Sequence, residues 1–389
     1  MQHAKVADRI RLLKPSGTLA MAEKAREIAK TGKRVLNMEL GEPDFSTPNH
    51  IKEAAYEAIK KDFTHYTSSR GIPELREAIS DDLKNMRVNS DPKEIIVTSG
   101  SKDGIYCACL VTLDPGDEAL VLSPTWPTHL TCIEFAQAKP IEVPCGEAYK
   151  LNEEALKEKV TKKSKMIVLC SPNNPTGGVL GEDDLQTIAD IAEDHNLFVV
   201  SDEIYNKIVY DGFRIRSMAA FENNRSRVIV VNGFSKTYAM TGWRLGYVFA
   251  DETIIDAIDK VIQTSTTCPA SFTQKAGVAA LRGSQNCVTK MVEEFDRRRR
   301  FIVERLNEIP GIRCEMPKGA FYVFPDFSSL KMSSFEICMK MLEEDGVCST
   351  PGSAFGEYGE GYIRFSYATS MGVISEAMEK VKEFVLRVS

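Results

Sequence analysis

The stretch VVNGFSKTYAMTGWRLGY, residues 230–247, begins as an apolar run and then turns polar within a few residues. Its first residues are typical of a buried β-strand, because a continuous run of β-branched side chains suits a strand that is covered on both faces. Ser235 and Lys236 follow that run directly, and Arg244 stands eight residues after the lysine. The sequence therefore predicts a functional site at the end of a buried strand.

Similar apolar runs occur throughout the middle of the chain: EIIVTS (94–99), EALVLS (118–123), PIEVP (140–144), KMIVLC (165–170), LFVVSD (197–202) and RLGYVFA (244–250). Amphipathic stretches such as EDDLQTIADIAEDHN, residues 182–196, separate these runs. Near-continuous apolar strands that alternate with helices are typical of a mostly parallel sheet that has helices on both faces. We therefore expect an α/β fold whose large domain holds a mostly parallel mixed sheet flanked by helices.

The C-terminal part of the chain has a different pattern, with a long charged helix predicted over residues 286–309. Short strands are predicted over residues 319–325 and 361–367, mixed with further helices. This pattern indicates a smaller α+β domain. The predicted division is an N-terminal segment (1–45) that packs with the small domain, a large domain (46–285) and a small C-terminal domain (286–389).

Composition argues against several classes of function. The 389 residues carry a formal net charge of -6, without a basic face or tail, so nucleic acid is not an expected partner. No apolar run reaches the roughly 18 residues of a membrane span. The N-terminus has no secretory signal and the ten cysteines form no C-x-x-C pair, which predicts a cytoplasmic protein with reduced cysteines. The five histidines lack the spacing of metal ligands, so no metal site is expected.

The densest cluster of charge is the run from Arg297 to Arg300, which follows Glu293, Glu294 and Asp296. Charges of both signs on a predicted helix are typical of a solvated face. We therefore expect this arginine run to lie in water.

Polar groups follow four of the predicted strands. They are Gly100-Ser101-Lys102, SPNNPTGG (171–178), Asp202 and Ser235-Lys236. In a doubly wound sheet, ligands bind just beyond the carboxyl ends of the strands. A polar turn, an amide, a carboxylate and an ammonium group are therefore expected to converge at one edge of the sheet.

The charges at this edge favour a phosphate group. Gly100, Ser101 and Lys102 are predicted to open a helix, where free backbone N–H groups and the helix dipole attract an anion. Ser235 and Arg244 add a hydroxyl and a guanidinium group that suit the same anion, although a surface ion pair is the alternative for Arg244. Neither G-x-x-x-x-G-K-[ST] nor G-x-G-x-x-G after a strand is present, so the phosphate is not expected to belong to a common nucleotide.

A lysine at this edge is suited to form a Schiff base if its surroundings lower its pKa. Asp202, on a neighbouring strand, is placed to keep a pyridine nitrogen protonated, as pyridoxal phosphate requires when it acts as an electron sink. The alternative for Asp202 is an N-cap for a helix over EIYNKIV. Lys236 and Asp202 together thus favour a pyridoxal phosphate site.

These residues resemble a known family, the class I pyridoxal-phosphate-dependent aminotransferases of fold type I, and within it the bacterial and archaeal aspartate aminotransferases. The signature S-K-x-x-x-x-x-G-x-R spans Ser235–Arg244. The resemblance also runs through KPSGTLAMAEKAREI (14–28), LGEPDFSTP (40–48), HYTSSRGIPELREAI (65–79), SDEIYNKIVYDG (201–212), KGAFYVFPDF (318–327) and PGSAFGEYGEGYIRFSYA (351–368).

The resemblance implies roles for four residues in catalysis. Lys236 would form the Schiff base with pyridoxal 5′-phosphate and then transfer the substrate's α-proton. Asp202 would pair with the pyridinium nitrogen. Asn174 and Tyr205 would hydrogen-bond the phenolic oxygen of the cofactor.

The resemblance also implies how the rest of the cofactor is held. Ser101, Lys102, Ser235 and Arg244 would bind its phosphate. Trp126 would stack on its ring, the alternative being ordinary core packing.

Substrate binding and assembly are implied in the same way. Arg364 would grip the substrate α-carboxylate beside the Gly41 backbone, with Trp126 and Asn174 also in contact with the substrate. Tyr66 matches a tyrosine that reaches the cofactor phosphate of a neighbouring subunit, which implies a homodimer with shared active sites.

The expected reaction is a ping-pong transamination between an amino acid and a 2-oxo acid. Lys14 and Lys102 resemble residues of the branch that acts on aspartate, and lysines suit a second carboxylate, although solvent exposure is the alternative for both. His129 stands where many relatives have a tyrosine, and the segment 103–113 is rich in cysteine and large aliphatic residues, which weighs against strict aspartate specificity. We rank aspartate with 2-oxoglutarate first, aromatic or broad specificity (alanine, prephenate) second, and a lyase on the same fold third.

Overall fold

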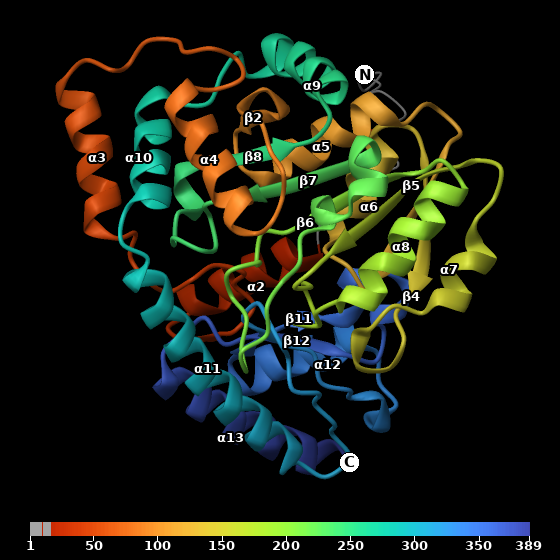
Figure 1. Cartoon of the computed structure of the whole chain (residues 1–389). Helices are drawn as coiled ribbons and strands as arrows, with labels where there is room; N and C mark the ends of the chain where they lie inside the picture. Colours follow the sequence, from red (N-terminus) through yellow and green to blue (C-terminus); the bar gives the residue numbers. More distant parts are fainter. Residues whose placement is uncertain (1–9, 11–16) are drawn as a thin grey trace, which may run out of the picture.

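The computed structural model describes residue 10 and residues 17–389 of the chain. In that part, seven strands form a central sheet in the order β2-β8-β7-β6-β5-β3-β4 (Figure 1). Their bounds are β2 Ile95–Thr98, β3 Glu118–Ser123, β4 Lys139–Pro144, β5 Ser164–Cys170, β6 Phe198–Asp202, β7 Val228–Gly233 and β8 Gly246–Phe249. β3, β4, β5, β6 and β7 are parallel to one another. β8 lies between β2 and β7 and is antiparallel to both. The prediction of a mostly parallel mixed sheet is confirmed.

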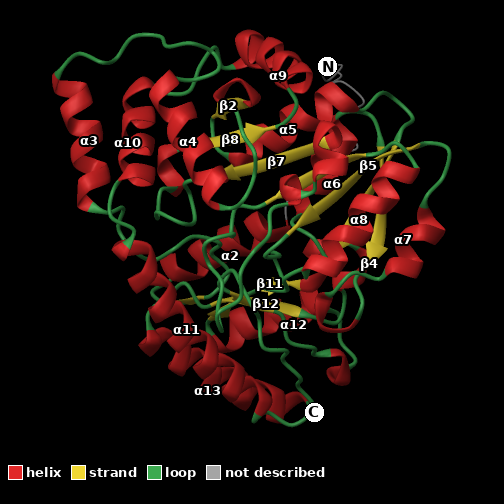
Figure 2. Ribbon diagram, viewed as in Figure 1, coloured by secondary structure: helices red, strands yellow, loops and turns green. Residues whose placement is uncertain are grey.

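Helices cover both faces of this sheet (Figure 2). Along β3, Leu120 packs into one hydrophobic core and Val121 into the other, because successive side chains of a strand point to opposite faces. One core includes residues of α3 (Asn49–Lys60), α4 (Pro73–Asn85), α7 (Glu153–Lys159), α8 (Glu182–Asp194) and α10 (Ser271–Arg282). The other includes residues of α5 (Ser101–Thr112), α6 (Pro127–Phe135) and α9 (Glu252–Ser265). Burial of both faces explains why the strands read as continuous apolar runs.

A smaller α+β unit with its own hydrophobic core lies against the carboxyl edge of the sheet (Figure 1). Its helices are α2 (Gly17–Lys30), α11 (Asn286–Asn307), α12 (Ser334–Lys340) and α13 (Met371–Val388). Its strands are β1 (Leu36–Asn37), β9 (Tyr322–Val323), β10 (Val347–Cys348), β11 (Thr350–Pro351) and β12 (Ile363–Ser366). β1 pairs with β10, and β12 pairs with β11 and β9. The strands predicted over 319–325 and 361–367 are therefore present but shorter than expected.

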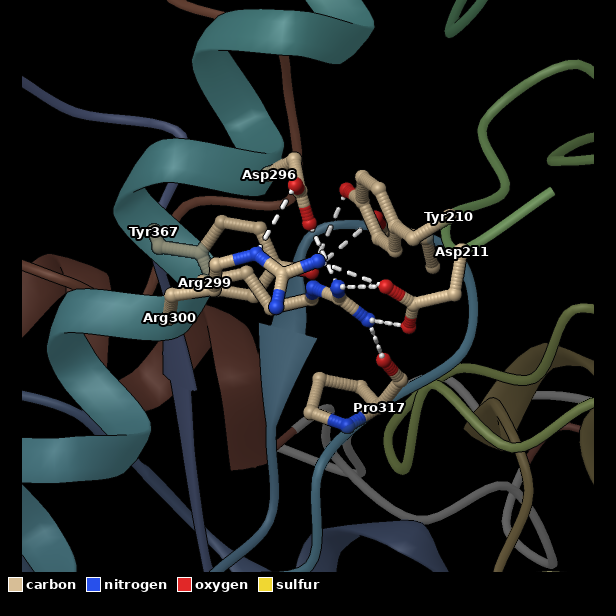
Figure 3. A network of polar contacts seen from close by, with 8 residues as sticks. Tyr210, Asp211, Asp296, Arg299, Arg300, Pro317 and Tyr367 are labelled. Atoms are coloured by element: carbon tan, nitrogen blue, oxygen red, sulfur yellow. Dashed lines mark hydrogen bonds and ion pairs between the residues drawn. The ribbon is translucent and has the colours of Figure 1, made fainter.

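The expectation that Arg297 to Arg300 all lie in water is wrong for Arg298 and Arg299. Figure 3 shows Arg299 with its polar partners. Arg298 is 6% exposed and Arg299 is fully buried. Both fall on the apolar stripe of α11, because four consecutive helical residues cover more than one turn and some must face the core. Arg299 donates to both oxygens of Asp211 at 2.8 and 2.9 Å and to the Pro317 carbonyl at 2.7 Å. Only Arg297 and Arg300 of the run are exposed.

Within residues 17–389, no helix is long and apolar enough to cross a membrane. The same residues contain no group of three histidine, cysteine or acidic side chains that could hold a metal ion. All ten cysteines are unpaired.

Candidate active site

Residues at or just beyond the ends of β2, β3, β5, β6 and β7 line a cavity of about 430 Å³, and residues of the small unit complete it. β2 contributes to the same edge as β7, because β8 runs antiparallel to both of them. Apart from Tyr66, and Lys14 which lies outside the described residues, the site residues that the sequence predicted all line the cavity: Gly41, Ser101, Lys102, Trp126, Asn174, Asp202, Tyr205, Ser235, Lys236, Arg244 and Arg364. Residues more than 300 positions apart in the sequence thus share one cavity.

Lys236 stands just beyond β7, and its side chain is partly buried at the edge of the sheet. Its ammonium nitrogen donates to the carbonyl oxygen of Gly41 at 2.5 Å. The pKa of Lys236 is lowered to about 8, mainly by burial; Glu42 opposes this shift, and the positive charges of Arg364 and Arg244 contribute to it. A substantial fraction of this amine is therefore neutral, and so nucleophilic, near neutral pH.

Asp202 ends β6 and is almost fully buried. One carboxylate oxygen accepts from the Ile204 backbone N–H at 3.1 Å, and the other lies 3.2 Å from His129 Nε2. Thr125 Oγ1 lies 2.7 Å from His129 Nδ1. Thr125, His129 and Asp202 thus form a buried chain of polar contacts. The segment after Asp202 forms a turn, not the helix that the N-cap alternative requires. His129 contacts Asp202 and does not line the cavity, so its replacement of a tyrosine carries no direct information about the substrate.

Two glycines make room for an anion at the start of α5. A Cβ on Gly100 would come within 2.5 Å of Arg244 Nη2, and a Cβ on Gly246 would come within 2.5 Å of the Ser101 nitrogen. The first N–H groups of α5, at Ser101 and Lys102, have no partner within the helix. Arg244 donates only to backbone carbonyls, those of Thr241 and Ser99. This donor set, with a helix N-terminus and a guanidinium without a carboxylate partner among the described residues, fits a phosphate group.

Arg364 lies on β12 and is 3% exposed. Its Nη1 donates to Asn174 Oδ1 at 2.9 Å, and its Nη2 donates to the Glu39 carbonyl at 2.5 Å and to Thr350 Oγ1 at 3.2 Å. Its Nε is buried and has no hydrogen-bond partner among the described residues. Burial lowers the pKa of Arg364. A carboxylate that enters the cavity would meet a positive charge that no carboxylate among the described residues balances.

Tyr205 and Tyr322 form a pair that the sequence interpretation only half recognised. The two hydroxyl oxygens are 2.8 Å apart, and both side chains are buried and line the cavity. Tyr322 falls in the predicted strand 319–325, and that strand signal alone did not single it out as a site residue. Tyr322 lies on β9, which pairs with β12, the strand that carries Arg364. This pairing, which the sequence does not reveal, brings Tyr322 to the same cavity as Arg364.

Lys102 and Trp126 border the outer side of the cavity. The Lys102 ammonium lies 5.0 Å from the centroid of the Trp126 ring, which is the geometry of a cation–π contact. The side chain of Lys102 is exposed, and no carboxylate among the described residues lies within ion-pair distance of it. Both residues also line a neighbouring hollow of about 1140 Å³. Lys14, the other lysine expected to meet the substrate, lies outside the described residues.

Tyr66 is 85% exposed and lies outside the cavity of its own chain. The predicted contact of Tyr66 with a neighbouring subunit's cofactor therefore stays a prediction.

Comparison with known proteins gives one consistent match. The family model described as "Aminotransferase class I and II" matches residues 33–381. The aspartate aminotransferase of Pyrococcus abyssi is 43% identical over 388 residues, which cover 98% of each chain. Aromatic-amino-acid aminotransferase 2 of Thermococcus litoralis is 40% identical, with 97% of each chain covered. The solved structure of the aspartate aminotransferase from Thermus thermophilus with maleate has a TM-score of 0.94 and 35% identity, covering 98% of this chain and 100% of that chain.

Proposed function

The chain belongs to the class I and II aminotransferases, and from that premise we propose that it transfers the amino group of L-aspartate to 2-oxoglutarate by a ping-pong reaction with pyridoxal 5′-phosphate. The observation that carries the proposal is the content of one cavity. It holds a buried amine of lowered pKa, a buried carboxylate, and a phosphate cradle formed by the start of α5 with Ser235 and Arg244. Among the other cations that line it, Arg364 and Lys102 have no carboxylate partner among the described residues. The two cations, Arg364 and Lys102, match a substrate with two carboxylates.

The cofactor, when bound, supplies an aldehyde that condenses with amines and a pyridine ring that accepts the electron pair of the broken Cα–H bond. The backbone N–H groups of Ser101 and Lys102 would hold its phosphate together with the side chains of Ser235 and Arg244, and Trp126 would pack on its ring. Asp202 holds a proton on the pyridine nitrogen, and His129 keeps the Asp202 carboxylate in place. Asn174 and Tyr205 hydrogen-bond the phenolic oxygen.

Lys236 is the residue that binds the cofactor's aldehyde and later carries the proton. With a pKa of about 8, roughly a tenth of this amine is neutral at pH 7, against less than a thousandth of an exposed lysine. The neutral amine would take the proton from the substrate's Cα, and the resulting ammonium would return it to the carbon on the other side of the substrate nitrogen, which came from the cofactor's aldehyde. This exchange needs a lysine whose two protonation states are both accessible near neutral pH.

Arg364 holds the α-carboxylate of the amino acid and of the oxo acid alike. Its guanidinium borders the cavity, while Asn174 and the Glu39 carbonyl hold its two terminal nitrogens. The Gly41 backbone lies beside it. This arrangement orients Cα toward Lys236 before the proton moves.

Lys102 is the residue assigned to the second carboxylate of the substrate. It lies over Trp126 at the outer side of the cavity, where a lysine can turn toward a ligand at little cost. The Thermus thermophilus relative was solved with maleate, a dicarboxylate, which supports this assignment.

Aromatic or broad specificity is the second candidate. The similarity to an aromatic-amino-acid aminotransferase is nearly as high as that to an aspartate aminotransferase. Trp126, Ile204 and Tyr322 give the cavity an apolar wall on which an aromatic side chain could pack.

The proposed assembly is a homodimer in which Tyr66 of each subunit reaches the other subunit's cofactor. An exposed tyrosine at the surface of one chain supports this assignment. The proposed domains are the N-terminal segment 1–45, the cofactor-binding domain 46–285 and the small domain 286–389.

A half-reaction screen tests the function. Purified protein with pyridoxal phosphate is mixed with single amino acids, and the cofactor spectrum is followed as aldehyde converts to amine. Aspartate is expected to react fastest; phenylalanine or tyrosine reacting faster would reverse the ranking. Borohydride reduction is expected to attach the cofactor to Lys236, and mass spectrometry that finds it on another lysine would contradict the site.

A variant separates the two candidate substrates. Lys102→Gln is expected to lower kcat/KM for aspartate about 10- to 100-fold, because a charged hydrogen bond to the second carboxylate is lost. The same variant is expected to leave kcat/KM for phenylalanine within about threefold. Lys150→Gln is the matched control, since Lys150 is also exposed but does not line the cavity. Equal losses for both substrates would remove Lys102 from the assignment.

A further inference from the structure

Tyr322 touches three residues of the proposed site at once. It is fully buried, and its hydroxyl lies 2.8 Å from that of Tyr205. A Cβ on Gly41 would come within 2.8 Å of the Tyr322 hydroxyl, so the glycine backbone and the phenol are in close contact. The guanidinium of Arg364 lies 4.6 Å from the centre of the Tyr322 ring.

The proton inventory of the tyrosine pair fixes its direction. A phenol hydroxyl has one proton to donate. Under the proposed function, the Tyr205 hydroxyl donates its one hydrogen bond to the phenolic oxygen of the cofactor. The Tyr205 oxygen must therefore accept a hydrogen bond from the Tyr322 hydroxyl. Burial raises the pKa of both phenols, so both hydroxyls stay protonated and Tyr322 has a proton with which to hydrogen-bond Tyr205.

We propose that Tyr322 is a positioning residue with two separable parts: its hydroxyl orients the Tyr205 hydroxyl toward the cofactor, and its ring supports the Arg364 guanidinium that holds the substrate carboxylate. This inference rests on the proposed function. The hydroxyl acts on the cofactor only through Tyr205. The ring acts on the substrate carboxylate through Arg364.

The hydroxyl predicts a spectroscopic effect. A hydrogen bond from Tyr205 favours the form of the bound cofactor in which the phenolic oxygen is negative and the Lys236 nitrogen joined to the cofactor has lost its proton. Tyr205→Phe therefore raises the pH midpoint of the cofactor's visible absorbance, by about one to two pH units for a hydrogen bond to a charged oxygen. Tyr322→Phe is expected to raise the midpoint by about half a unit, because Tyr205 keeps its hydroxyl but loses its orientation.

A double variant shows whether the effect passes through Tyr205. In the Tyr205→Phe background, adding Tyr322→Phe is expected to leave the midpoint unchanged, since no hydroxyl remains to be oriented. Tyr367→Phe is the matched control. It removes the hydroxyl of another fully buried tyrosine that bonds a tyrosine, at 3.2 Å from Tyr210, outside the cavity. The control is expected to leave the midpoint unchanged.

The ring predicts an effect on binding. Tyr322→Phe keeps the ring and is expected to leave the dissociation constant of maleate, used as a dicarboxylate probe, within about twofold. Tyr322→Leu removes the ring and is expected to weaken maleate binding about 10- to 30-fold, the range of a desolvated cation–π contact. A purely structural role would make the midpoint and the dissociation constant change together in both variants.

The outcomes separate the inference from the function on which it rests. Wild-type protein that shows no pH-dependent cofactor absorbance contradicts the proposed function, and the inference with it. Wild-type protein with the expected midpoint, and Tyr322→Phe with the same midpoint, overturns the inference alone. If Tyr322→Phe does not fold, Gly41→Ala displaces the same hydroxyl from the opposite side and is expected to raise the midpoint; an unchanged midpoint there also overturns the inference.

Discussion

Arg299 and Arg364 are almost equally buried, at 0% and 3% exposure, yet their partners are of different kinds. Arg299 is held by two carboxylates, those of Asp211 and Asp296 (Figure 3). Arg364 is held by an amide, a hydroxyl and a backbone carbonyl, and no carboxylate among the described residues lies within ion-pair distance of it. One buried charge is neutralised by the fold and the other is not.

The pKa values of the two arginines move in opposite directions. Burial opposes the charge of Arg299, but the hydrogen bond to Asp211 and the charge of Asp296 raise its pKa overall. Burial lowers the pKa of Arg364, and the opposing influences of Tyr322, Tyr205 and Glu39 do not cancel the shift. A buried arginine with its own carboxylate is part of the scaffold, whereas one without a carboxylate is suited to bind an anion from solution.

Arg364→Ala is the strongest test of this contrast. It is expected to lower kcat/KM about 10²- to 10³-fold for amino acids and oxo acids alike, because the substrate carboxylate loses a charged, forked partner. The free energy of unfolding is expected to change by less than about 1 kcal/mol, because no carboxylate is left unpaired. Steady-state kinetics and urea unfolding measure the two quantities, and an unchanged KM for both substrates would rule out the carboxylate-binding role.

Arg299→Ala is expected to give the reverse result. Its free energy of unfolding should fall by about 2–3 kcal/mol, because Asp296 and Asp211 lose their buried partner, although Asp211 is itself half exposed. Turnover per folded molecule should stay near that of the wild type. Arg300→Ala is the control, since Arg300 contacts the same Asp211 from the surface and should cost less than about 1 kcal/mol. Equal losses in the two variants would show that burial of the pair contributes nothing.

Glu203 extends the contrast to a buried acid. One of its carboxyl oxygens accepts from Ser217 Oγ at 2.9 Å and from the Met218 N–H at 3.0 Å, while Oε2 has no partner among the described residues. Burial raises the pKa of Glu203 to about 7 from an ordinary value of 4.5. Between these values the folded protein binds the proton more tightly than the unfolded chain does. Stability is therefore lost as the pH rises from about 4.5 to 7, by at most about 1.4 kcal/mol per pH unit.

Glu203→Gln should remove this part of the pH dependence. Free energies of unfolding measured at pH 5 and pH 7 are expected to differ less in the variant than in the wild type. The same difference in both proteins would show that Glu203 does not titrate in this range.

The strands were predictable because their signal is local. The run EALVLS coincides with β3, residues 118–123, and a sheet buried on both faces requires no knowledge of strand order. The clustering of Lys236, Asp202 and Asn174 in one cavity was also within reach, since parallel strands place their carboxyl ends at one edge. The roles assigned to these residues stay predictions.

The errors share a cause, which is that the decisive partner is distant in the sequence. Arg298 pairs with Asp44, and Arg299 with Asp211, across 254 and 88 positions. His129 was read as a departure from a substrate pattern because its partner Asp202, 73 positions away, could not be inferred. Charge patterns and motifs describe neighbours along the chain, whereas burial and pairing depend on neighbours in space.

The antiparallel strand β8 has a consequence for how the protein folds. It pairs with β2, and this contact joins segments separated by more than a third of the chain. Gly246 of β8 packs directly against the start of α5, so the phosphate cradle does not exist until this strand is inserted. Closing so long a loop costs entropy before any contact repays it, which places the step late in folding. Capture of the cofactor during refolding would therefore report completion of the sheet, and the nascent chain cannot hold a phosphate there before β8 has been synthesised.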